Sequence, residues 1–146
     1  MNPELDAALV GDFPMLYAQR GKPMNETAMC WGFDCGDGWY GIIRELSEQL
    51  EWLNKTDAVL IEAVQVKEKF GTLRFYTQIR DCDSGFPWHM VDALCDDAGV
   101  RSGTICEECG QYGRLREGGW IRTLCDQCES DRGRAQNDER NHGETI

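Results

Sequence analysis

The spacing of apolar residues along the chain predicts three helices. From residue 39 to residue 53, apolar side chains recur at intervals of three and four, which is the spacing of one helical face. Asp37 stands just ahead of this segment as a candidate N-cap. A second segment, residues 87 to 99, carries Pro87 in its expected first turn, and a shorter helix is expected over residues 3 to 10.

Between the two longer helical segments the apolar period changes to two. Residues 59 to 70 are rich in β-branched types, and after Gly71 the apolar residues from 73 to 79 alternate with polar ones. Two such segments joined at a glycine predict a β-hairpin whose apolar face packs on the helix that begins at Trp39. The expected fold class for residues 1–100 is therefore α+β, with a helix packed on a small antiparallel hairpin or sheet.

Four of the eight cysteines form two Cys-x-x-Cys pairs with fifteen residues between them. This spacing is typical of four-thiolate zinc sites. We therefore expect a zinc ribbon over residues 101–128, with a small hairpin closed at Gly118-Gly119. So small a module buries little apolar area, and one structural zinc ion is expected to supply about 10 kcal/mol of folding free energy. The predicted metal ligands are Cys106, Cys109, Cys125 and Cys128.

Two alternatives concern the cysteines. An iron–sulfur cluster or a redox dithiol is the competing interpretation of the two pairs, whereas catalysis by the ion is disfavoured because four thiolates leave no position for water. A second metal site is conceivable from the other cysteines together with His89, but their spacings match no standard pattern, and buried thiols are the favoured interpretation. These cysteines are Cys30, Cys35, Cys82 and Cys95.

The charge of the chain is concentrated in its first part. The net charge is −11, and residues 1–100 hold 17 acidic against 8 basic side chains, while residues 101–128 hold four of each. Such a surface repels phosphate backbones and attracts basic proteins, although it also serves solubility alone. The last segment, residues 129–146, is almost without apolar residues and is expected to be a disordered tail. No apolar run is long enough to span a bilayer, the start lacks a leader pattern, and the chain is interpreted as cytoplasmic.

Three segments together resemble a known family. They are Cys-Gly-Asp-Gly-Trp at 35–39, Val-Lys-Glu-Lys-Phe-Gly-Thr-Leu-Arg-Phe-Tyr at 66–76 and Gly-Trp-Ile-Arg-Thr-Leu-Cys at 119–125. They are similar to a family of small uncharacterised proteins of bacteriophages, prophages and bacteria, in which a helix and hairpin precede a cysteine module. The resemblance covers most of residues 35 to 128. It implies a bacterial or phage setting, hence the cytoplasm of a bacterial host, and it carries no activity.

Three functions are weighed. The favoured one is a non-enzymatic zinc-binding protein that binds another macromolecule, as a phage-encoded regulator or inhibitor whose acidic surface occupies the basic groove of a host defence or transcription protein. The first alternative is nucleic-acid binding by the ribbon through Arg114, Arg116 and Arg122, although the module is neutral before its metal is counted. The second is a small metal-dependent enzyme, for which only His89 and His142 are available as histidines.

The tryptophans are read in two groups. Trp52 lies on the polar side of its helix and is a candidate partner-binding residue, because aromatic side chains are enriched at interfaces. The other four, Trp31, Trp39, Trp88 and Trp120, are expected to be core or packing residues.

Overall fold

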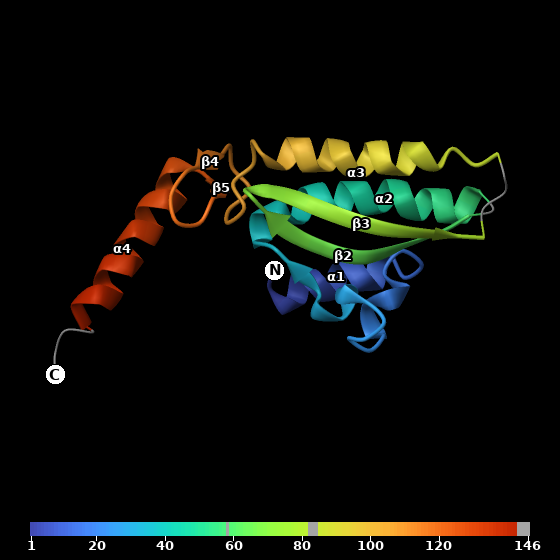
Figure 1. The fold of residues 1–146 in the computed structure, drawn as a ribbon, viewed down its shortest axis with the longest axis horizontal. Coiled ribbons are helices and arrows are strands. Elements are labelled where there is room, and N and C mark those ends of the chain that lie inside the picture. Colours follow the sequence, from blue (N-terminus) through green and yellow to red (C-terminus); the bar gives the residue numbers. More distant parts are fainter. Residues whose placement is uncertain (58, 82–84, 143–146) are drawn as a thin grey trace.

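The chain consists of an α+β domain, a small two-stranded module and a projecting helix (Figure 1). This computed structural model describes residues 1–57, 59–81 and 85–142, and in the last helix side chains are described only as far as residue 135. The elements in chain order are α1 (Pro3–Asp12), η1 (Ala18–Gly21), η2 (Ala28–Trp31), β1 (Phe33–Asp34), η3 (Asp37–Trp39), α2 (Tyr40–Thr56), β2 (Leu60–Lys69), β3 (Thr72–Arg80), α3 (Trp88–Ser102), β4 (Arg114–Arg116), β5 (Arg122–Leu124) and α4 (Asp126–His142).

The larger sheet has the strand order β1-β2-β3. The predicted hairpin is confirmed: β2 and β3 pair antiparallel, with a register shift between Ala63 and Gln65. The two-residue strand β1 pairs parallel to β2, placing Phe33 opposite Val66. Sequence periodicity did not predict β1, because two residues define no period and their pairing is set by contacts far along the chain.

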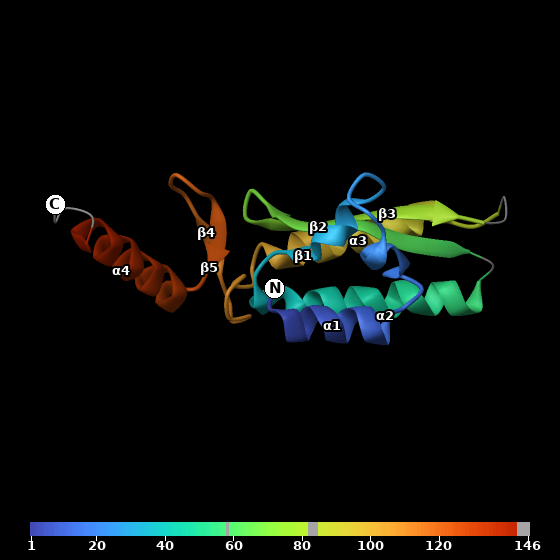
Figure 2. The ribbon, with the colours of Figure 1, turned by 90° about the horizontal axis from the view of Figure 1, so that it is seen from below.

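Helices cover one face of this sheet. Figure 2 shows α1 and α2 side by side on that face, and α3 lies against α2 and along β3. The apolar face of α2 was predicted correctly, since the positions that recur at helical spacing, Ile42, Ile43, Leu46, Leu50 and Leu53, are all buried. The fully buried side chains that tie helices to sheet include Leu9, Trp39, Ile43, Leu50, Ile61, Val66, Leu73 and Val91.

The start of α2 differs from the prediction. Asp37 was expected to cap it, but the helix is preceded by the short turn η3 and has no side-chain cap. The Asp37 carboxylate instead accepts hydrogen bonds from the backbone N–H (2.7 Å) and the side-chain amide (2.8 Å) of Asn2. Asn2 is itself the N-cap of α1, so Asp37 anchors α1 to the domain.

Aromatic burial was overestimated. Of the four tryptophans expected to be core or packing residues, Trp39 is fully buried, whereas Trp31, Trp88 and Trp120 are exposed. Phe70 is also exposed, because it occupies the turn between β2 and β3 with φ of 53° and so leaves the strand alternation. Trp52 is 62 % exposed, which keeps it available as a contact residue.

The expectation of a disordered tail is wrong for residues 129–142, which belong to α4. The acidic residues Asp126 and Glu129 in its first turn favour the helix through its dipole, and Gln127 donates to Asp131 one turn later. An expectation based on composition alone does not include these local helix-favouring contacts. The remaining four residues of the expected tail, 143–146, lie outside the described part. No helix that the structure describes is long and apolar enough to cross a membrane.

Candidate metal centre

The four predicted cysteine ligands lie together. The sulfurs of Cys106, Cys109, Cys125 and Cys128 are all within 4.8 Å of one another, and the Cys109 and Cys125 sulfurs are 3.7 Å apart. A tetrahedral site with metal–sulfur bonds of about 2.3 Å requires sulfurs about 3.8 Å apart. The donor set therefore fits a metal ion held by four thiolates.

The first pair of ligands lies on a tight turn after α3. Gly110 donates its backbone N–H to the Cys106 carbonyl (2.9 Å), and Cys106 donates to the Gln111 carbonyl (2.7 Å). Gly110 adopts φ of 77°, a conformation that side chains other than glycine rarely take. Cys106 is buried and Cys109 is exposed, so the site has one side toward the domain and one toward solvent.

The second pair of ligands lies at the start of α4. Cys125 directly precedes the helix and accepts a backbone hydrogen bond from Cys128 at its sulfur (3.4 Å). This bond lowers the pKa of the Cys125 thiol to about 7, while burial and then the neighbouring sulfurs raise the pKa of Cys128. The thiolate that a metal needs is thus favoured at Cys125 even before an ion arrives. Helix α4 begins directly after Cys125 and contains Cys128, so its start coincides with the second pair of candidate ligands.

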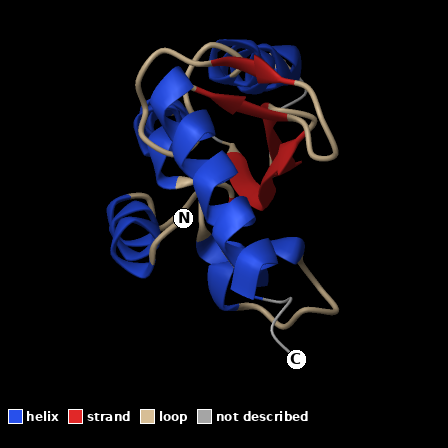
Figure 3. Cartoon of the chain, turned by 90° about the vertical axis from the view of Figure 1, so that its left-hand side faces the viewer, coloured by secondary structure: helices blue, strands red, loops and turns tan. Residues whose placement is uncertain are grey.

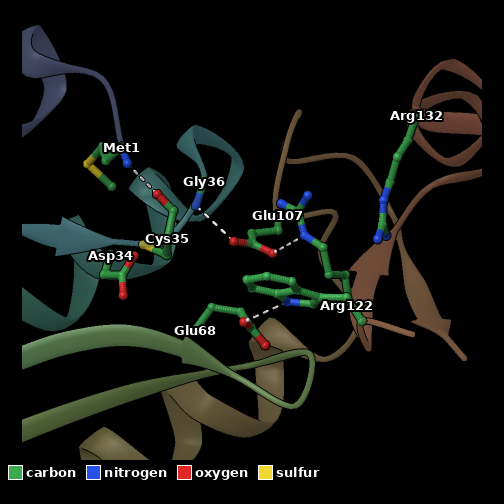
Figure 4. A pocket seen from close by; sticks show the side chains of 9 residues that line it. Met1, Asp34, Cys35, Gly36, Glu68, Glu107, Arg122 and Arg132 are labelled. Atoms are coloured by element: carbon green, nitrogen blue, oxygen red, sulfur yellow. Dashed lines mark hydrogen bonds and ion pairs between the residues drawn. The ribbon is translucent and has the colours of Figure 1, made fainter. Parts of the chain in front are cut away.

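Glu107, between the first two ligands, joins the metal module to the domain. Its carboxylate is buried and accepts hydrogen bonds from the Gly36 backbone N–H and from the Arg122 guanidinium, both 3.0 Å (Figure 4). Its backbone carbonyl accepts from Gly38 (2.7 Å), and its N–H donates to the Thr123 carbonyl (2.9 Å). One residue therefore contacts both the loop before α2 and strand β5.

Two glycines allow the module to approach the domain closely. A Cβ at Gly38 would overlap the Cys106 carbonyl and the Gly110 nitrogen, and a Cβ at Gly71 would overlap the Leu115 side chain. The Gly71 carbonyl also accepts a buried hydrogen bond from the Thr123 hydroxyl (2.6 Å). At Gly38 the backbones of the domain and the module thus touch, and a side chain there would separate them, whereas at Gly71 the φ of 79° is the stronger reason for a glycine.

The three segments that carry the family resemblance meet at this junction. Gly36 and Gly38 come from the first, Gly71 from the second, and Arg122 and Thr123 from the third. Their shared role in the fold is therefore to dock the module on the end of the domain (Figure 1), the end that faces the viewer in Figure 3. No sequence signal indicates that Glu107 belongs to the same contact, because a glutamate inside Cys-x-x-Cys is ordinarily interpreted as an exposed turn residue.

The three ribbon arginines proposed as nucleic-acid contacts form ion pairs with carboxylates of the same chain. Arg114 and Arg116 both pair with Asp126, at 3.0 and 2.6 Å, and this pairing holds the pKa of the Asp126 carboxyl below its usual value. Arg122 pairs with Glu107 and also with Glu108. The predicted hairpin closed at Gly118-Gly119 is confirmed by the pairing of β4 and β5, but its cations point to neighbouring carboxylates.

Trp52 borders an open groove between α2 and α3. The groove has a volume of about 470 Å³ and is also lined by Leu53, Met90 and Leu94. Its acidic rim residues are internally paired, Glu45 with Arg101 (2.7 Å) and Glu48 with Arg44 (3.4 Å). The groove is therefore apolar and close to neutral.

The other cysteines do not gather into a second metal site within the described residues, where only the four ribbon cysteines form such a group. Burial raises the pKa of the Cys35 thiol to about 12 and that of Cys95 to about 12, which keeps both protonated. His89 is exposed beside Trp88, and Cys82 lies outside the described residues. The interpretation as buried apolar thiols fits Cys35 best.

A scan against protein-family models and searches of curated proteins and of solved structures gave no match for this chain. The family resemblance described above therefore stays a prediction.

Proposed function

We propose that the four-cysteine centre holds one zinc ion with a structural role. Four thiolates at tetrahedral separation suit zinc, and they fill its coordination sphere, so no position is left for a substrate or an activated water. When bound, the ion supplies cross-links between the turn after α3 and the start of α4. The chain's own residues, chiefly Glu107 and Thr123, then fix the cross-linked module to the domain.

We further propose that the chain acts without catalysis, by binding a basic surface of another protein. The observation that carries this proposal is a pair of exposed carboxylates on α3, Asp92 and Asp96, one helical turn apart. Among the described residues neither has a cation within 4 Å, unlike Asp97, which pairs with Arg101. Unpaired carboxylates on a chain of net charge −11 attract a basic partner and speed its approach.

The resemblance to phage and bacterial proteins suggests the partner's setting. The proposed partner is a host protein in the bacterial cytoplasm, of the defence or transcription class, whose nucleic-acid groove is basic. An acidic surface would occupy that groove by the same electrostatics that attract nucleic acid. The chain would thereby act as a regulator or inhibitor of its host partner.

The experiment that tests this function is affinity capture from bacterial lysate with the zinc-loaded chain, with and without nuclease, followed by mass spectrometry. The proposal predicts a protein retained in stoichiometric amount whether or not nuclease is present. Recovery of nucleic acid alone, lost after nuclease treatment, would contradict it.

A second candidate function, binding of single-stranded nucleic acid, is favoured by one feature of the hairpin. Lys67 lies 5.9 Å from the centre of the exposed Tyr76 ring, and Lys69 lies 5.4 Å from that of the exposed Phe70 ring. Neither lysine has a carboxylate within 4 Å in the described chain. Cations beside stacking surfaces suit single strands. With two or three phosphate contacts, the affinity for a labelled oligothymidylate should fall with a log–log salt slope of about −2.

A test of this alternative compares the Lys67→Glu/Lys69→Glu variant with the wild type in an oligothymidylate binding assay. Loss of binding in the variant would favour the hairpin as a nucleic-acid site. Equal binding, or none by either protein, would remove this candidate. The metal-dependent enzyme has no comparable supporting observation.

A further inference from the structure

Strand β3 forms one edge of the larger sheet. The strand order β1-β2-β3 leaves no strand beyond it among the described residues. The backbone N–H of Leu73 points away from β2, because it donates to the hydroxyl of Ser102 on α3 (2.8 Å). In an antiparallel ladder the direction of the backbone groups alternates, so Phe75 and Thr77 also direct their N–H and C=O groups away from β2.

A groove runs between this edge and α3. At one end the helix touches the strand, since a Cβ at Gly99 would lie 3.1 Å from the Leu73 carbonyl. The groove beside it has a volume of about 760 Å³ and is lined by the strand from Thr72 to Thr77 and by one side of α3. In Figure 1 the two elements diverge toward the beginning of α3. The outward backbone groups of Phe75 and Thr77 therefore border an open groove.

The helix side of the groove carries the unpaired carboxylates Asp92 and Asp96. Four residues of helix advance about 6 Å along its axis, and two residues of strand advance about 6.6 Å. Side chains two positions apart on an extended segment therefore have nearly the spacing of these two carboxylates. Arg74 also lines the groove and keeps its positive charge, since its guanidinium donates to the neutral Thr72 hydroxyl (2.8 Å) on its own strand; the lining therefore holds two carboxylates against one cation.

We propose that this groove binds an extended, basic segment of the partner protein as an added strand beside β3. The partner's backbone hydrogen-bonds to Phe75 and Thr77, and two Lys or Arg side chains two positions apart pair with Asp92 and Asp96. Open sheet edges are a recurrent means of peptide recognition, in which the backbone gives affinity and the side chains give selectivity. This inference rests on the proposed function and names its contact surface.

The probe for the test is a nine-residue peptide of alternating Lys and Thr with blocked ends, titrated into the zinc-loaded chain at 50 mM salt by calorimetry and by NMR. The peptide should bind and shift the Phe75 and Thr77 amide signals. The isosteric variant Asp92→Asn/Asp96→Asn should bind it about tenfold more weakly, because two charge pairs are lost. The charge-matched control Glu26→Gln/Glu117→Gln, which alters exposed carboxylates outside the groove, should change the affinity less than about twofold.

Strand addition differs from simple charge attraction in needing the backbone hydrogen bonds of the peptide, which can be removed without changing its charge. A peptide N-methylated at the alternate amides that face β3 keeps every charge but should bind at least about tenfold more weakly, because its donors are removed. The Thr77→Pro variant removes the backbone N–H of residue 77, which points into the groove, and should weaken binding of the unmodified peptide in the same way. If it does not fold, the N-methylated peptide still decides the matter.

Three results would overturn the inference: no binding of the Lys peptide, equal binding of its N-methylated form, or equal binding by Asp92→Asn/Asp96→Asn. If the lysate capture nevertheless retains a nuclease-resistant protein, the proposed function stands and only the groove is wrong. If the capture also fails, both are wrong.

Discussion

At the scale of single residues, the junction between domain and metal module depends on a few side chains of unequal burial. Glu107 and Glu108 are neighbours, and both pair with Arg122. Yet the Glu107 side chain is 5 % exposed and that of Glu108 is 49 % exposed. A buried carboxylate leaves its partners unsatisfied when it is removed, whereas an exposed one is replaced by water.

We therefore expect Glu107→Ala to lower the free energy of unfolding of the zinc-loaded chain by about 3 kcal/mol, because the Gly36 amide and Arg122 lose a buried acceptor. The matched variant Glu108→Ala should lower it by less than about 1 kcal/mol. Urea denaturation at neutral pH measures both values. Equal effects of the two substitutions would show that Glu107 does not hold the junction.

Two glycines near the start of α2, one before the helix and one inside it, allow a second comparison. Gly38→Ala should destabilise the chain by about 1–3 kcal/mol, because its Cβ would overlap the Cys106 and Gly110 backbones, which cannot move aside without separating the module. Gly41→Ala, inside α2 with nothing within 4 Å of the added carbon, should stabilise the chain by about 0.5 kcal/mol. Thermal unfolding of both variants tests the contrast, and a harmless Gly38→Ala would contradict the close approach.

At the scale of elements, the metal module is short of apolar contacts of its own. Strands β4 and β5 have three residues each, and Leu115 in β4 is half exposed. Its order is expected to come from the metal ion and from docking at Glu107 and Thr123. The domain has its own core, including Trp39, Ile43 and Val66, and is therefore expected to stay folded without the ion.

Removal of the metal should accordingly unfold the module and spare the domain. After chelation, or in Cys109→Ser, amide signals of residues 104–128 should collapse, those of Gly36 and Gly38 should shift, and those of Val66 and Leu73 should stay. Cys30→Ser is the matched control. Global unfolding on chelation would contradict this division between module and domain.

The stability of the module should also depend on pH. Because metal ligation needs thiolates, the affinity for the metal should fall as the pH falls below neutral, so the module's stability is lost toward acid and not toward base.

The elements also show which parts of the fold were predictable from sequence. Helix α2 and the β2–β3 hairpin were predictable, because apolar periods of three to four and of two are local signals in the sequence. The apolar residues that carry these periods form the core. The cluster of four cysteines was predictable for the same reason, since Cys-x-x-Cys spacing is a local signal. Strand β1, the exposed Trp120 and the buried Glu107 were not, because each depends on a segment far away in the chain. Helix α4 was missed because composition was weighed above its local helix-favouring contacts.

At the scale of the whole molecule, some charged side chains are paired within the chain and others are left for a partner. The ribbon arginines are neutralised by Asp126, Glu107 and Glu108, while Asp92 and Asp96 have no such partners in the described chain. The α3 side therefore offers a partner two unpaired carboxylates, while Lys67 and Lys69, which have no carboxylate within 4 Å in the described chain, lie on the hairpin. Binding through the acidic side requires long-range attraction, which salt screens over about 10 Å at 0.1 M.

The ionic-strength dependence of the affinity for the captured host protein tests the central claim most directly. The account predicts saturable binding at 50 mM salt that weakens at least about tenfold by 500 mM, with the same result after nuclease treatment. An affinity that does not change with salt would contradict binding through the acidic surface.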